Sequence, residues 1–382
     1  MADDELESFV AEANRFAFAL LHKLPSDSDS RVLSPFSIHN ALMMVWRGSG
    51  TGSTTDLGMQ QALQLATGVS YDAANSRIYN QIMRSSTDEN IVRLANALWV
   101  EPSYDLNPQY TDLLQRSYGA PLAKLDFVKD PDYSAEVINQ WTREQTNNRI
   151  AELIGPAAIK PNTRLIITNG VYFKGHWQTP FSRELTRTAD FFKADHSRSK
   201  VSLMQNTDPQ PRFGYHQSSL GQLLELPYAG EQLSMILLLP RPDHSLPELY
   251  APRAAGQLLG AMKMMAPQRV DVYLPRFKIE SALQLSEPLK QMGMAAAFSD
   301  QADFSGISTA RDLKISAVLH KANIETDEAG SEAAAATAVL MEKTSAAIEP
   351  TPVPVFRADR PFLFLIRHRE SRLILFMGAF NG

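Results

Sequence analysis

Cysteine is absent from this chain of 382 residues. The sequence therefore excludes a disulfide framework and a thiol nucleophile, and the stability of the fold must come from packing. Acceptor sites of the form Asn-x-Ser/Thr are also absent, so nothing indicates glycosylation. No apolar run approaches the ~18 residues of a membrane-spanning helix, and we expect no membrane span.

An excess of positive charge is absent too. The formal net charge is -5, which gives no basic surface of the kind that binds nucleic acid. Residues 1–7 are acidic and lack the basic start and apolar core of a signal peptide. The chain is therefore either cytoplasmic or a mature secreted or cell-surface form from which a signal was removed.

Linkers are the third feature that is missing: there is no Gly/Ser tract, no long charge block and no low-complexity insert. We expect a single domain over residues 1–382, large enough for a sizeable core. Hydrophobic periodicity predicts a mixture of helices and long strands, the α+β class. The predicted helices are 5–23, 35–46, 55–66, 72–86, 108–118, 133–148 and 246–264, and the main predicted strands are 91–100, 163–177, 270–279, 312–327, 360–367 and 373–378. Ser34 is the expected N-cap of the second helix, and Pro35 takes its favoured first position.

The stretch 328–345 lies between two strand-like segments and is rich in alanine. Its composition alone fits an alanine-rich helix or a small-residue linker as well as it fits a strand. Because successive strand residues face opposite sides of a sheet, a strand here would have one uncharged face. That face would hold Ser331, Ala333, Ala335, Thr337, Val339 and Met341, while Glu332 and Glu342 would both lie on the other. Gly330 would supply a flexible pivot before the segment.

This pattern resembles the hinge and reactive loop of the serpin family. The match is closest at Glu328, Gly330, Ser331, Glu332, Ala333, Ala334, Ala335 and Ala336. Other stretches also resemble the family in the right order: Ser34-Pro35-Phe36-Ser37-Ile38, residues 163–177 with Asn169 and Trp177, and residues 302–308. About ten such motifs cover essentially the whole chain, and the alanine-rich hinge is similar to that of inhibitory members of prokaryotic or intracellular type.

The resemblance implies a fold in which helices pack on a large central, mostly antiparallel sheet with two smaller sheets, and an exposed reactive loop at 328–355. It also implies an irreversible protease inhibitor and no enzyme. A target protease would cut the loop and form an acyl-enzyme, the hinge would enter the central sheet as a strand, and the protease would be trapped.

The implied partners are serine proteases of trypsin-like, elastase-like or subtilisin-like specificity, or cysteine proteases, bound by a monomer. We expect no cofactor and no metal. The predicted helix 72–86 has only Arg77 and Arg84 as cations, so we expect no heparin binding. The family's function slightly favours an extracellular location.

The reactive bond has two candidates. Proline cannot donate to a sheet ladder, so Pro350, Pro352 and Pro354 should end insertion and confine the cut to 340–349. The family's usual register indicates Thr344–Ser345. Side-chain chemistry indicates Lys343–Thr344, because a trypsin-like pocket would take Lys343. Both bonds remain candidates for the reactive bond.

By resemblance, Ser34, Ser37, Asn169 and His320 form a polar cluster under the central sheet, and Trp177 lies at the top of that sheet. For His320 and Trp177 a plain core position is the simpler interpretation, and the two interpretations are compatible. Two other functions compete with inhibition. One is a non-inhibitory serpin that acts as a carrier or chaperone, although bulky, charged or proline residues are expected in such hinges. The other is a Ser-x-x-Lys hydrolase at Ser197 and Lys200.

Overall fold

The computed structural model describes residues 2–25, 29–66, 71–331 and 352–382. The predicted reactive bond at Lys343, Thr344 and Ser345 therefore lies outside the described residues. So do the hinge positions from Glu332 to Ala336. The described part of the hinge ends at Ser331.

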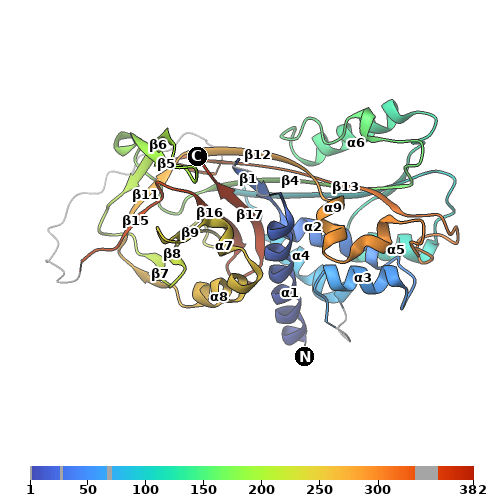
Figure 1. The fold of residues 1–382 in the computed structure, drawn as a ribbon, viewed down its shortest axis with the longest axis horizontal. Helices are drawn as coiled ribbons and strands as arrows, with labels where there is room; N and C mark the ends of the chain where they lie inside the picture. Colours follow the sequence, from blue (N-terminus) through green and yellow to red (C-terminus); the bar gives the residue numbers. More distant parts are fainter. Residues whose placement is uncertain (1, 26–28, 67–70, 332–351) are drawn as a thin grey trace.

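A six-stranded sheet with the longest strands lies at the centre of the molecule (Figure 1). Its pairings are antiparallel except β2–β3 and a direct parallel pairing of β4 with β13. The strand order is β12 (Phe277–Gln284), β13 (Ile315–Thr326), β14 (Gly330–Ser331), β4 (Leu165–His176), β2 (Asn90–Val100) and β3 (Leu122–Lys124).

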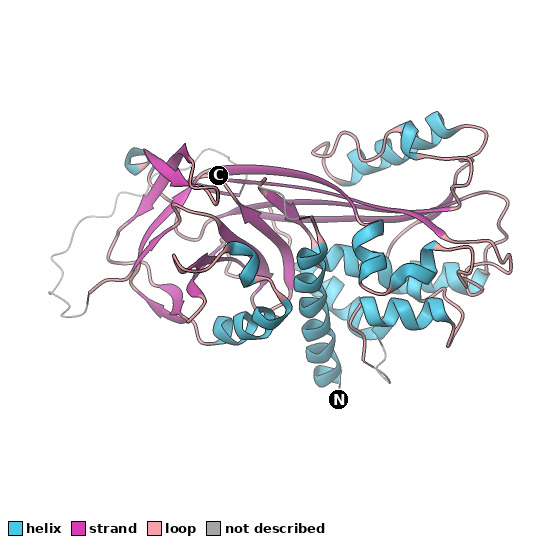
Figure 2. Ribbon diagram, viewed as in Figure 1, coloured by secondary structure: helices cyan, strands magenta, loops and turns pink. Residues whose placement is uncertain are grey.

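Two further sheets lie in the same half of the molecule (Figures 1 and 2). The four-stranded sheet lies at one end of the long strands, and the seven-stranded sheet lies beneath part of them. The seven-stranded sheet has shorter strands in the order β1 (Arg31–Leu33), β17 (Ile374–Phe380), β16 (Phe362–His368), β9 (Leu233–Pro240), β8 (Gly221–Pro227), β7 (Phe213–Gln217) and β10 (Ala266–Gln268). The four-stranded sheet has the order β15 (Val355–Arg357), β11 (Asp271–Pro275), β6 (Arg198–Asn206) and β5 (Arg187–Phe192). Every residue of β9, β16 and β17 is buried, which explains why these strands are apolar on both faces.

Helices cover both faces of the central sheet (Figure 2). Helix α6 (Pro131–Gln145) packs on the outer face, and α2 (Pro35–Trp46) packs on the inner face against β2 and β4. The remaining helices are α1 (Ala2–Lys23), α3 (Thr54–Ala62), α4 (Tyr71–Arg84), α5 (Pro108–Ser117), α7 (Leu246–Leu249), α8 (Pro252–Lys263) and α9 (Ser286–Gln291), with 3-10 turns η1 (Pro156–Ala158), η2 (Arg183–Leu185) and η3 (Met294–Phe298). The α+β class is thus confirmed, and so is the expected arrangement of helices on a central, mostly antiparallel sheet with two further sheets. Residues 332–351 of the expected exposed loop lie outside the described residues.

Two local predictions need correction. The predicted helix 246–264 is divided into α7 and α8, because Ala251 is extended before Pro252, as the residue before a proline usually is. Ser34 does stand at the N-cap of α2, followed by Pro35. Its hydroxyl makes no cap bond, however; it donates a hydrogen bond to the Leu375 carbonyl of β17 at 2.6 Å.

Candidate functional site at the hinge and the β4–β13 seam

The described end of the hinge already lies within the central sheet. After β13 the chain turns back at once, and Gly330 and Ser331 pair with His176 and Gly175 of β4, while Ser331 also pairs with Thr326 of β13. The turn is held by Asp327, whose side chain accepts the backbone N–H groups of Ala329 and Gly330 at 2.9 and 3.1 Å. Two residues of the hinge therefore occupy the top of the seam between β4 and β13.

Gly330 is required at this position by both conformation and space. Its φ of 154° is one that side chains rarely adopt. A Cβ would stand 2.0 Å from the Gly175 carbonyl oxygen of the neighbouring strand, which no rearrangement of a flexible side chain could relieve. Any other residue would push the hinge out of the sheet.

Ser331 is fully buried against an aromatic pair. Its hydroxyl is 2.9 Å from the Tyr228 hydroxyl, and the Tyr228 ring stacks on Trp177 with centroids 4.6 Å apart. Trp177 in turn donates through Nε1 to the Asp327 carbonyl at 2.9 Å. Burial raises the pKa of Tyr228, so it stays a neutral hydroxyl group here. Trp177, which the resemblance placed at the top of the central sheet, thus lies beside the hinge. Sequence reasoning missed Tyr228.

Glu328 anchors the turn from the other side. Its side chain is only 2 % exposed and accepts two hydrogen bonds from the Arg276 guanidinium, at 2.7 and 2.6 Å. Thr186 donates a third bond. Burial opposes ionisation, but the bonds from Arg276 and Thr186 outweigh it and hold the pKa of Glu328 below its usual value. Neither partner was identified from the sequence.

A polar cluster lies lower in the same seam and includes all four predicted residues. Ser37 donates to Asn96 Oδ1 at 3.0 Å, and Asn169 Nδ2 donates to Ser37 at 2.6 Å and also contacts Asn96. His320 Nδ1 contacts Asn169 Oδ1. The Ser34 backbone N–H donates a hydrogen bond to His320 Nε2 at 3.1 Å. Asn96 is the member that sequence reasoning missed.

The protonation of His320 follows from these partners. Nε2 accepts a hydrogen bond, so it carries no proton, and Nδ1 carries the proton that is donated to Asn169. Burial lowers the pKa of His320 to about 3. His320 is therefore neutral near pH 7.

The cluster spans the seam itself. His320 of β13 and Asn169 of β4 are register partners in the direct parallel pairing that runs from Ile315 and Leu165 to Asn323 and Tyr172. Below Ser331, the two strands are thus bonded to each other. A further strand could enter only if the contact between His320 and Asn169 separated.

The sequence model of the family Serpin (serine protease inhibitor) matches residues 11–382. The chain belongs to the serpin family. The chain is 37% identical to a leukocyte elastase inhibitor of Bos taurus over 99% of this chain and 100% of that protein. It is also 36% identical to human Serpin B8 over 98% and 99% of the two chains. Serpins are protease inhibitors, and these relatives agree with that class.

Solved structures agree with the fold of this serpin. The native state of the thermophilic serpin tengpin superimposes with a TM-score of 0.87 at 26% identity, over 98% of this chain and 94% of that one. Uncleaved ovalbumin gives a TM-score of 0.81 at 27% identity, over 97% and 98%.

The hydrolase hypothesis finds no support in the serpin's geometry. Ser197 donates its hydroxyl to Asp195 at 2.6 Å, whereas Lys200 pairs with Asp190 at 2.7 Å. The two side chains thus bind different carboxylates, and Lys200 is not placed to take a proton from Ser197.

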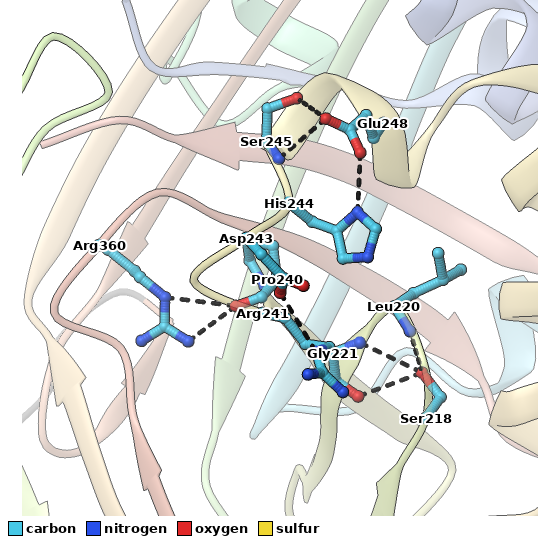
Figure 3. A network of polar contacts seen from close by, with 10 residues as sticks. All are labelled: Ser218, Leu220, Gly221, Pro240, Arg241, Asp243, His244, Ser245, Glu248 and Arg360. Atoms are coloured by element: carbon cyan, nitrogen blue, oxygen red, sulfur yellow. Dashed lines mark hydrogen bonds and ion pairs between the residues drawn. The ribbon is translucent and has the colours of Figure 1, made fainter.

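A second group of Ser, His and Glu side chains, at the start of α7, is structural as well (Figure 3). The Ser245 hydroxyl and the His244 imidazole both bind the Glu248 carboxylate, at 2.7 and 2.8 Å, so no histidine accepts the serine proton. Among the described residues, no group of His, Asp and Glu could hold a metal ion, and no helix has the length and apolar character needed to cross a bilayer.

Proposed function

We propose that this serpin is a suicide-substrate inhibitor that traps serine proteases by inserting its cleaved reactive loop between β4 and β13. The observation that carries the proposal is the pairing of Gly330 and Ser331 with both strands of the seam. The hinge is already in register, so insertion only has to continue from Ser331. The protease would be attached through an ester to the loop residue before the cut.

The register of the described pairs predicts the inserted state. Continued from Ser331, it would put Thr337 beside Asn169 of β4 and His320 of β13, which are register partners of each other. The polar side chain of Thr337 would then reach the polar cluster, while Ala333 and Ala335 would face the packed inner side. This agreement supports the alternation read from the sequence.

The same register supports a cut at the predicted bonds. Met341 would be opposite Leu165, the first residue of β4. A strand that ends near Lys343 or Thr344 would therefore fill the seam to its lower end. Cleavage at Lys343–Thr344 or Thr344–Ser345 would release a strand of this length, and both bonds are retained as proposals.

The favourable free energy of loop insertion would have two sources. The inserted strand would be antiparallel to both β4 and β13, which replaces one parallel pairing by two antiparallel ones. Burial of Val339 and Met341 on the inner face would add roughly 1.5–3 kcal/mol for each side chain. Such a gain is available only after cleavage, because an intact loop is tied at both ends.

The test is a denaturing gel of the serpin mixed with trypsin, elastase or subtilisin in separate reactions. We expect a stable adduct at the summed mass with at least one of them, and mass spectrometry of the released peptide would identify the bond. Ala333→Arg should abolish the adduct, because position 333 would face the core of the inserted sheet. Glu332→Arg, one position earlier, is the matched control and should keep it.

Clean cleavage without an adduct in the wild type would refute the proposal and favour the carrier or chaperone function. Equal adducts in both arginine variants would refute the register, even if trapping occurs.

A further inference from the structure

Two Asn-Gly pairs occur in the sequence, and one of them lies inside the β4–β13 seam. They are Asn169-Gly170 in β4 and Asn381-Gly382 after β17. Asparagine loses its side-chain amide most readily when glycine follows it, because glycine has no side chain to hinder the backbone nitrogen that attacks. Inhibition of a protease requires no such reaction, so the pair in the seam calls for a separate explanation.

The reaction is intramolecular and needs only water. The backbone nitrogen of Gly170 loses its proton and attacks Cγ of Asn169. A C–N bond forms, the Cγ–Nδ2 bond breaks, and the amide leaves as ammonia together with that proton. Water then opens the cyclic imide at one of its two carbonyl groups. The product is aspartate or isoaspartate, and in isoaspartate the main chain runs through Cγ and is longer by that carbon.

The backbone of the closed seam prevents ring closure. For the ring to close, Asn169 must rotate about its Cα–C bond out of the extended conformation, so that the nitrogen of Gly170 meets Cγ. Gly170 is in register with Ala95 of β2 on one side and with Lys321 of β13 on the other. The rotation would therefore disrupt strand pairing on both sides of β4.

The side chain of Asn169 is held as well. It is 1 % exposed, and its Nδ2 donates to Ser37 at 2.6 Å and contacts Asn96 Oδ1. Its Oδ1 contacts His320 Nδ1 across the seam. Both polar atoms of the amide thus have partners, and rotation towards Gly170 would leave buried groups unpaired. Separation of β13 from β4 removes the restraint on Oδ1.

The second pair is restrained much less. Asn381 and Gly382 belong to no strand, and Asn381 is half-buried. The side chain of Asn381 donates to the Asp29 carbonyl at 2.9 Å, in an exposed position. This pair is therefore an internal reference for the same chemistry in the same molecule.

We propose that Asn169-Gly170 is a site of spontaneous deamidation, which reacts only while the seam between β4 and β13 is open. Each reaction permanently marks a molecule whose seam has opened. Aspartate at position 169 would lack the Nδ2 donor and would place a carboxylate against Asn96 Oδ1. Isoaspartate would shift the register of the later residues of β4. Either product keeps the polar cluster from forming again.

The test is peptide mass spectrometry of the full chain after incubation at neutral pH, with the two pairs followed separately. The rate at each pair is divided by its rate in concentrated urea, which removes intrinsic differences between the pairs. We expect the normalised rate at Asn169 to be at least about a hundredfold lower than that at Asn381, because local opening of a central sheet is rare.

Three variants separate opening of the seam from general unfolding. His320→Ala removes the contact across the seam and should raise the normalised rate at Asn169 about tenfold, with no change at Asn381. Ile236→Val removes one methylene from a fully buried side chain of β9, outside the central sheet, and is the control for a general loss of stability. Gly170→Ala should slow the reaction at Asn169 in urea, where the stability of the fold plays no part.

Four outcomes would overturn the proposal. They are equal normalised rates at Asn169 and Asn381, equal acceleration by His320→Ala and Ile236→Val, no reaction at Asn169 in urea, and an unchanged rate in urea for Gly170→Ala. The first and third need only the wild type, so the proposal can be refuted even if His320→Ala does not fold. No protease is present, so the outcome is independent of the proposed inhibition.

Discussion

Acidification should weaken this serpin well before its carboxylates titrate, because it contains buried neutral histidines. Burial lowers the pKa of His320 to about 3 and that of His39 to about 4, from an ordinary value of 6.5. Both folded values lie below the unfolded one, so the unfolded chain binds more protons in acid. The stability that the neutral rings provide is complete above pH 6.5 and is lost as the pH falls from 6.5 towards the folded values.

The magnitude follows from the difference in proton binding. At pH 5 an unfolded histidine is almost fully protonated, whereas both buried rings stay mostly neutral. Each ring then costs about 2 kcal/mol of unfolding free energy relative to pH 7.5. The pKa of His368 is lowered by burial too, which adds a loss of the same sign. Together these are a large part of a typical ~5–15 kcal/mol.

The assay is urea unfolding of the intact serpin at pH 7.5 and pH 5. His320→Gln and His39→Gln should each remove about 2 kcal/mol of the difference between the two pH values, whatever their effect at pH 7.5. The reasoning about a given ring fails if its variant keeps the full pH dependence of the wild type. It fails for the whole set if wild-type stability is the same at both pH values.

Two substitutions test single contacts. Arg276→Ala should lower the unfolding free energy by about 2 kcal/mol, because Glu328 would remain buried without its guanidinium partner. Adding Glu328→Gln to Arg276→Ala should recover part of that loss. If urea unfolding shows that the effects of the two substitutions simply add, the coupling between the two side chains is contradicted. Gly170→Ala should raise the unfolding free energy by about 1 kcal/mol. The new Cβ would contact Thr142 of α6 at 3.2 Å and Ile150 at 3.4 Å, and the unfolded chain would lose conformational entropy. A lower melting temperature would show that α6 cannot adjust to the added methyl group.

The local sequence pattern was enough to predict most of the helices and strands. The pair Ser34-Pro35 marked the start of α2, and the long apolar runs marked β2, β4 and β13. The break between α7 and α8 was missed although Pro252 signals it, because the apolar pattern continues on both sides. Periodicity indicates which face of an element is buried, but it does not detect a single residue in extended conformation within a helical pattern.

The hinge shows what the sequence by itself determined. One face of the period-2 pattern is uncharged and both glutamates lie on the other face, which defines a segment that can join a sheet without burying a charge on its inner face. Gly330 supplies a flexible pivot just before this segment. These are properties of consecutive residues, and the chain carries them wherever it folds.

Only the tertiary structure decided the partners. Tyr228 is 103 residues from Ser331, Arg276 is 52 residues from Glu328, and Asn96 lies 73 residues from Asn169. Ser34 had a local role available as a helix cap, yet its hydroxyl bonds a carbonyl 341 residues away. No periodicity links such positions, because the distance between them is set by the order and register of strands. The order and register of the strands therefore determine which polar groups bond across the seam between β4 and β13, while the sequence alone determines the alternation of the hinge residues.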